Sequence, residues 1–141
     1  MILTIYTDGG ARGNPGPAAI GVVFNWGDDQ STLAKYIGST TNNVAEYTAV
    51  VEAIAHFSQG LALQGIITSL VFNLDSELVV KQLGGLYKVK EPTLQTLHAK
   101  VKSSLAEIDI PYTFNHVRRA YNAAADKLVN QALDAQLQVI A

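Results

Sequence analysis

The 141-residue chain contains no cysteine, which excludes disulfide bonds and any metal site built on thiolates. Charged residues make up only 16% and there are four prolines, so the composition is not that of a disordered or low-complexity protein. No apolar run approaches the roughly 20 residues that a membrane span needs, and the N-terminus has no basic leader. We therefore expect no membrane segment and a cytoplasmic location.

Apolar sequence is plentiful enough for one ordinary domain. Hydrophobic residues make up 48% of the chain, and a domain of this length can bury roughly 70% of the surface that its unfolded chain exposes. Neither a linker nor an internal repeat is visible. We therefore expect residues 1–141 to form one domain, and we expect it to be a monomer.

The net charge of −2 offers no general attraction to a polyanion, but the charge is unevenly distributed. Residues 81–102 carry a net charge of +4, whereas residues 1–74 carry −3. The basic stretch is compatible with a nucleic-acid contact and with an ordinary solvated helix face. On charge alone, the solvated face is the better interpretation.

The order of apolar patterns predicts an α/β fold. Strands are expected over residues 2–7, 19–26, 33–37, 66–74 and 110–117. Helices are expected over residues 43–58, from Ser76 up to Gly84, from Pro92 to about Leu105, and over 122–137. Three strands in meander order, followed by strand and helix units, imply a mixed sheet with helices packed on it, because parallel neighbours require crossover connections.

Four acidic residues occupy related places in this predicted fold. Asp8 follows the first strand and Asp75 the fourth, while Glu46 and Asp126 lie in the first turns of helices. Carboxyl ends of parallel strands and N-termini of the following helices share one edge of such a sheet, so we expect these acids to converge. Clustered carboxylates repel each other unless divalent cations lie among them. Oxygen ligands without histidine or cysteine favour Mg²⁺ or Mn²⁺ over Zn²⁺.

Each acid also has an ordinary structural explanation. Asp8 precedes Gly9 and is expected at a turn, and Glu46 stands three residues after Asn43, where it would complete a capping box. Asp75 is a candidate N-cap, and Asp126 would complement a helix dipole. The shared edge favours the metal site, and that edge depends on the predicted strand order.

Five motifs in this order resemble the signature of the type 1 ribonuclease H family, or ribonuclease HI, along nearly the whole chain. They are Thr7-Asp8-Gly9-Gly10, Gly13-Asn14-Pro15-Gly16-Pro17, Thr40-Thr41-Asn42-Asn43 with Glu46-Tyr47, Asp75-Ser76, and Asn122 with Ala125-Asp126. The resemblance implies the ribonuclease H-like fold, with a five-stranded mixed sheet of order 3-2-1-4-5 flanked by helices. It also implies hydrolysis of the RNA strand of RNA/DNA hybrids to products with 5′-phosphate and 3′-hydroxyl ends.

The same resemblance assigns the site. Asp8, Glu46, Asp75 and Asp126 correspond to the four catalytic, metal-binding acids of a two-Mg²⁺ mechanism, with Mn²⁺ as an alternative metal. By this analogy Asp8 bridges both ions, Asp126 helps to hold one of them, and Glu46 with Asp75 holds the other. The positions expected to contact nucleic acid are Gly9, Gly10, Asn14, Thr41, Asn42, Asn43, Arg118, Arg119 and Asn122.

Several of these contact positions have a second interpretation. Asn14 and Asn43 also suit a turn and a helix cap. For Arg118 and Arg119, a phosphate contact and a surface salt bridge are about equally well supported.

The chain departs from the best-known bacterial members at three places. Residues 117–122 are too short for their histidine-containing loop, and His116 is expected to pack with Tyr112 and Phe114 on an alternating strand. Residues 86–91 leave no room for a basic protrusion, for which Lys88 and Lys90 would substitute weakly. Glu77 stands where many relatives have glutamine. The chain thus resembles a branch that lacks the loop and the protrusion.

Two other functions are compatible with parts of the sequence pattern. A catalytically silent nucleic-acid-binding module of the same fold is disfavoured because all four acids are present. An unrelated sugar-kinase-like phosphate binder would need a second domain, for which 141 residues leave no room. Activity on RNA–DNA junctions or double-stranded RNA stays open at this point.

Overall fold

A five-stranded mixed sheet forms the centre of the computed structural model, which describes residues 1–63 and 65–140. The strands are β1 (Ile2–Ala11), β2 (Gly16–Trp26), β3 (Asp29–Thr40), β4 (Ser69–Leu74) and β5 (Tyr112–His116). Their order is β3-β2-β1-β4-β5, with β1, β2 and β3 antiparallel and β4 and β5 parallel to β1. The predicted five-stranded mixed sheet of order 3-2-1-4-5 is confirmed.

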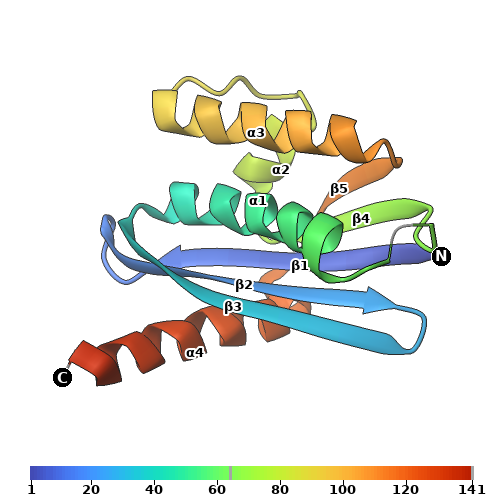
Figure 1. Ribbon diagram of the computed structural model, residues 1–141. Helices are drawn as coiled ribbons and strands as arrows, with labels where there is room; N and C mark the ends of the chain where they lie inside the picture. Colours follow the sequence, from blue (N-terminus) through green and yellow to red (C-terminus); the bar gives the residue numbers. More distant parts are fainter. Residues whose placement is uncertain (64, 141) are drawn as a thin grey trace.

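Helices cover both faces of this sheet (Figure 1). They are α1 (Asn42–Gly60), α2 (Glu77–Leu83), α3 (Pro92–Ile108), the 3₁₀-helix η1 (Arg119–Asn122) and α4 (Ala123–Ile140). Figure 1 shows α1, α2 and α3 on one side of the sheet and α4 on the other. In the described part of the chain, none of the helices combines the length and apolarity that crossing a lipid bilayer demands.

The hydrophobic core lies between the sheet and the first three helices. Its largest fully buried side chains include Tyr47 and Phe57 from α1 and Phe24 and Phe72 from the sheet. On the opposite face, α4 buries Ala125, Val129 and Leu133, whose spacing of four residues places them on one side of the helix. This second contact fixes α4 against β2 and β3.

Two glycines let helices approach the sheet closely. A Cβ atom at Gly9 would lie 2.2 Å from the carbonyl oxygen of Ala45, and one at Gly21 would lie 2.2 Å from the carbonyl oxygen of Ala125. No other residue fits at either place, because real Cβ atoms do not approach backbone oxygen so closely. The glycines therefore set how near α1 and α4 come to the strands beneath them.

Some predicted element boundaries were wrong. The glycines after Asp8 suggested a turn, but β1 continues through them to Ala11, paired with β2, because α1 packs directly over Gly9. Strand β3 is longer than 33–37, since its backbone pairing with β2 extends through polar residues at both ends. The fourth strand begins at Ser69 rather than 66, and Asn122 belongs to η1 rather than to the last helix.

Candidate active site

The four predicted acids line one cleft of about 390 Å³. Asp8, Glu46 and Asp75 each offer a carboxylate oxygen, and these oxygens lie within 4.8 Å of one another. Asp126 lines the same cleft from α4. The structure therefore brings together side chains that are separated by up to 118 positions in the sequence.

The sheet and the two close helix contacts explain this convergence. Strands β1 and β4 are parallel neighbours in which Thr7 pairs with Leu74, so the residues that follow, Asp8 and Asp75, lie side by side. Glu46 comes from α1, next to the Ala45 carbonyl that rests on Gly9. Asp126 lies in the first turn of α4, where α4 crosses β2 at Gly21.

None of the four acids is used as a helix cap. Thr41 caps α1, its hydroxyl accepting a hydrogen bond from the Val44 N–H at 3.2 Å, so the capping box expected from Asn43 and Glu46 does not form. Ser76 caps α2 and accepts from the Val79 N–H at 3.3 Å, so Asp75 is not the N-cap. The carboxylates of Glu46 and Asp75 are thereby left to face the cleft.

Burial and mutual repulsion make this cluster electrostatically unfavourable. Asp8 is 7% exposed, and burial together with the charges of Asp75 and Asp126 raises its pKa from 3.8 to about 7. Burial and the charges of Asp8 and Asp75 likewise raise the pKa of Glu46 well above its ordinary value. A positive charge among these oxygens would remove the repulsion.

One buried oxygen also lacks a partner. Oε2 of Glu46 is shielded from solvent and makes no hydrogen bond to any residue that the structure describes. A buried, unpaired carboxylate oxygen is destabilising unless a ligand pairs with it. The donor set is all oxygen, of the kind that Mg²⁺ and Mn²⁺ prefer. The residues present therefore fit a divalent cation.

Hydrogen bonds within the protein use several of the polar groups that were expected to contact nucleic acid. The Ala11 N–H donates to Oδ1 of Asn42 at 2.9 Å, and the Asn42 N–H donates to Oδ1 of Asn14 at 3.0 Å. Thr41 caps α1, as described above. These side chains fasten the β1–β2 loop to the start of α1. Asn42 and Asn43, both exposed at the start of α1, also line the cleft.

The other expected contact residues lie in different surroundings. Gly9 and Gly10 line the cleft, although Gly9 is buried beneath α1. Arg118 and Arg119 are both exposed, and Arg119 is the one that lines the cleft. Asn122 is 1% exposed and donates to the carbonyl of Thr7 at 2.9 Å, so the structure places its side chain inside the protein instead of at the surface.

The family of the chain is shown by its similarity to known proteins. Residues 2–134 match the family model described as RNase H. The chain belongs to the ribonuclease H family. A solved structure of LC11-RNase H1, in complex with RNA/DNA hybrid, is 45% identical with a TM-score of 0.90, covering 96% of this chain and 99% of that chain.

Two further relatives agree with this placement in the ribonuclease H family. RNase H1 from the halophilic archaeon Halobacterium salinarum is 37% identical with a TM-score of 0.85, covering 96% of this chain and 99% of that chain. A bifunctional protein of Mycobacterium tuberculosis is 41% identical over 142 residues, covering 98% of this chain. The chain spans only 37% of the length of that relative.

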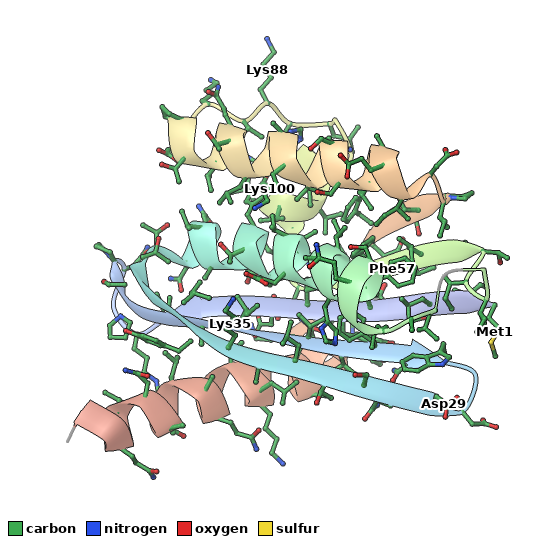
Figure 2. The ribbon with its side chains drawn as sticks, in the orientation of Figure 1. Met1, Asp29, Lys35, Phe57, Lys88 and Lys100 are labelled. Atoms are coloured by element: carbon green, nitrogen blue, oxygen red, sulfur yellow. The ribbon has the colours of Figure 1, made fainter. Side chains whose placement is uncertain are left out.

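Two connections stand where the sequence was expected to lack the basic protrusion and the histidine-containing loop. Residues 84–91 join α2 to α3, and Figure 2 shows Lys88 extending away from the rest of the molecule there. Residues 117–122 join β5 to α4 and contain η1. His116 is exposed at the end of β5 rather than packed with Phe114, so the packing role expected for it was wrong. Glu77 forms an ion pair with Lys81 one turn later.

The cleft residues that sequence reasoning missed include Arg12 and Asn130. Arg12 stands between Gly10 and Gly13 in the sequence, and its position between the two glycine-containing motifs was the available signal. For Asn130 the signal was its place one turn after Asp126 on the same helix.

Proposed function

We propose that this chain is a divalent-metal-dependent endoribonuclease that hydrolyses the RNA strand of RNA/DNA hybrids, leaving 5′-phosphate and 3′-hydroxyl ends. The observation that carries the proposal is the set of carboxylate oxygens of Asp8, Glu46 and Asp75 within 4.8 Å of one another, with Oε2 of Glu46 buried and unpaired among the described residues. The hybrid bound to a neighbour of 45% identity supports this choice of substrate.

All four acids line one cleft, and the resemblance to ribonuclease H assigns them to two cations. By this analogy Glu46 and Asp75 would hold one cation together with Asp8, and Asp126 would help to hold the other, with Asp8 shared between them. Mg²⁺ is the proposed metal, with Mn²⁺ as the alternative. When bound, such cations acidify an attacking water and neutralise the phosphate of the scissile bond.

The chain's own residues supply the positioning. Asp8 and Glu46 are buried, Asp75 is half-buried and Asp126 is exposed, and the sheet and two helices that carry them hold the four carboxylates in place as the substrate arrives. The rim of the cleft carries Asn43 and Arg119. Short polar groups and a guanidinium of this kind suit contacts with 2′-hydroxyls and phosphates across a minor groove. Arg118, exposed beside Arg119, is proposed as a second phosphate contact.

A catalytically silent nucleic-acid-binding module of the same fold is the alternative function. A silent module does not require an acidic cluster in which Asp8 and Glu46 are buried, and such a cluster destabilises the protein unless a cation compensates. The enzymatic proposal is therefore preferred. A monomer in the reducing cytoplasm is proposed as its setting, because the chain has no cysteine.

The test uses a labelled RNA strand annealed to DNA, incubated with the protein in the presence of Mg²⁺ or a chelator. We expect metal-dependent cleavage within the RNA strand, and its loss in Asp8→Asn, because an amide cannot supply the anionic oxygens that the metal needs. Asp28→Asn, which removes a charge from the exposed β2–β3 turn, is the matched control and should cleave normally. Binding without cleavage under every metal condition would favour the silent module.

The same assay decides the substrate range. An RNA–DNA junction and double-stranded RNA both present 2′-hydroxyls in A-form-like geometry, so each is tested beside the hybrid. We expect the hybrid to be cleaved fastest. Faster cleavage of double-stranded RNA would reassign the substrate while leaving the metal site intact.

A further inference from the structure

Arg12 connects the β1–β2 loop to the helix that carries Asp126. Its Nη2 lies 2.7 Å from Oδ1 of Asp134 and donates to Oδ1 of Asn130 at 3.3 Å. Nδ2 of Asn130 donates in turn to the backbone carbonyl of Asp126 at 3.1 Å. The guanidinium is thus held by two side chains from successive turns of α4, at one wall of the cleft.

The backbone around Arg12 is also fixed. The Arg12 N–H donates to the carbonyl of Pro17 at 2.8 Å, which closes the loop between β1 and β2. Ala11 is bound to the side chain of Asn42, and Asn42 to that of Asn14. Arg12 therefore projects from a loop that is fastened to α1 on one side and to α4 on the other.

The acidic character of the cleft suggests a second role for Arg12, in addition to fastening the loop. Among the described residues that line the cleft, the cationic ones are Arg12 and Arg119, against four carboxylates. A polyanion that approaches these acids needs cations at the rim. Nη2 carries two of the five guanidinium N–H groups; it donates a hydrogen bond to Asn130 and forms the ion pair with Asp134. The donors on Nη1 and Nε make no hydrogen bond to any residue in the described ranges, and the side chain is 38% exposed.

We propose that Arg12 binds a backbone phosphate of the nucleic acid in the cleft, and that Asp134 and Asn130 are positioning residues that hold its guanidinium in place. The proposal rests on the proposed function, since it names a contact of that same substrate. Pre-orientation matters because an unrestrained arginine loses much rotamer freedom when it binds. An exposed ion pair contributes little to stability. If the pair of Arg12 with Asp134 only fastened the loop, replacing Asp134 should therefore leave the affinity for nucleic acid unchanged.

The experiment measures affinity for a fluorescent RNA/DNA hybrid by anisotropy, in the absence of divalent metal, over a series of salt concentrations. Arg12→Ala should weaken binding by about tenfold, the loss of one charge-assisted hydrogen-bonded contact. It should also reduce the slope of log K against log salt by about 0.7–0.9, as expected for one lost phosphate contact. Arg12→Lys should keep the slope and bind about threefold more weakly than the wild type, since the charge remains but the planar fork is lost.

Asp134→Asn tests whether Asp134 orients the Arg12 guanidinium or affects binding only through its negative charge. Removing a negative charge near the cleft should tighten binding of a polyanion if only long-range charge matters. The proposal instead predicts binding about threefold weaker, with an unchanged slope, because the guanidinium loses its orientation. Lys35→Ala is the matched control: Lys35 is also ion-paired, with Glu52 at 3.2 Å, and Figure 2 shows it on β3, away from α4. It should leave affinity and slope unchanged.

The outcomes separate this proposal from the proposed function. If the wild-type protein binds hybrid and Arg12→Ala has the same affinity and slope, Arg12 is not a phosphate contact. If Asp134→Asn tightens binding, the positioning role is wrong. If the wild-type protein neither binds nor cleaves hybrid, the proposed function itself fails. Melting temperatures within about 2 °C of wild type show that each variant is folded.

Discussion

Asn122 and Thr7, which are 115 positions apart in the sequence, are joined by a hydrogen bond of 2.9 Å from Nδ2 of Asn122 to the backbone carbonyl of Thr7. Thr7 directly precedes Asp8 on β1, and Asn122 ends η1, directly before α4 and Asp126. One buried amide thus links the strand and the helix that carry two of the four acids. We infer that this bond sets the position of Asp126 relative to Asp8.

Replacing Asn122 with alanine should therefore lower both stability and activity. Loss of this buried hydrogen bond should reduce the free energy of unfolding by about 1–3 kcal/mol. Urea denaturation measures this change. Asn115→Ala is the control, because the bond from Nδ2 of Asn115 to Oδ1 of Asn73 is exposed; its effect should stay below about 0.5 kcal/mol. Equal effects of the two substitutions would contradict a special role for Asn122.

Gly9 and Gly10 provide a second comparison, between adjacent positions on one strand. A Cβ atom at Gly9 would lie 2.2 Å from the Ala45 carbonyl oxygen, whereas one at Gly10 would meet Cγ1 of Val129 at an ordinary 3.7 Å. Gly9→Ala should destabilise the protein by at least about 1–3 kcal/mol, since α1 must move away from β1. Gly10→Ala should change stability by less than about 0.5 kcal/mol. Thermal or urea unfolding tests both, and a well-tolerated Gly9→Ala would refute the close helix contact.

The raised pKa of Asp8 predicts how stability depends on pH in the metal-free protein. Because this pKa is about 7 in the folded protein, against an ordinary value of 3.8 for the unfolded chain, the folded state binds more protons over that interval. The free energy of unfolding should therefore fall as pH rises from about 4 to 7. Glu46, whose pKa is also raised, acts in the same direction.

Melting temperatures with a chelator and with Mg²⁺, over a pH series, check this dependence. Asp8→Asn should lose the part of the pH-dependent destabilisation that comes from Asp8, and should be more stable than wild type above about pH 7 without metal. Mg²⁺ should stabilise the wild type more at high pH than at low pH, since protonated carboxyls do not bind it. If stability rises with pH equally in the wild type and in Asp8→Asn, the burial and mutual repulsion of the carboxylates do not destabilise the folded protein.

Arg118 and Arg119 are distinguished by the structure, although the sequence treats them alike. Only Arg119 of the two lines the cleft. Arg119→Ala should therefore weaken hybrid binding more than Arg118→Ala and lower the salt slope by about 0.7–0.9. The double variant should weaken binding further if both touch phosphate. If neither single variant alters the slope, both arginines are structural.

The mixed sheet could be predicted from the sequence, because three strands in a meander followed by strands separated by helices require one. The strand order 3-2-1-4-5 was implied by the resemblance to ribonuclease H and is the order that the structure shows. The convergence of Asp8 with Asp75 follows from that order, since parallel neighbours end at one edge. The helical spacing of Ala125, Leu128, Val129, Ala132 and Leu133 also predicts one inward face for the last helix, and of these Ala125, Val129 and Leu133 are buried.

Local patterns failed where a distant contact decides the structure. Gly9 suggested a turn, but it is glycine because α1 crosses it. Asn43 suggested a helix cap, yet Thr41 takes that role. The burial of Asn122 and the pairing of Arg12 with Asp134 join opposite ends of the chain. No local periodicity or propensity carries such information.

The most direct test of the account is a crystal structure of the protein grown with Mn²⁺, in which anomalous scattering locates the metal. The account predicts anomalous peaks among the carboxylates of Asp8, Glu46 and Asp75, with a further peak toward Asp126 when a hybrid is bound. The account would be contradicted if the crystalline protein cleaved hybrid in Mn²⁺ while no anomalous peak lay at these carboxylates.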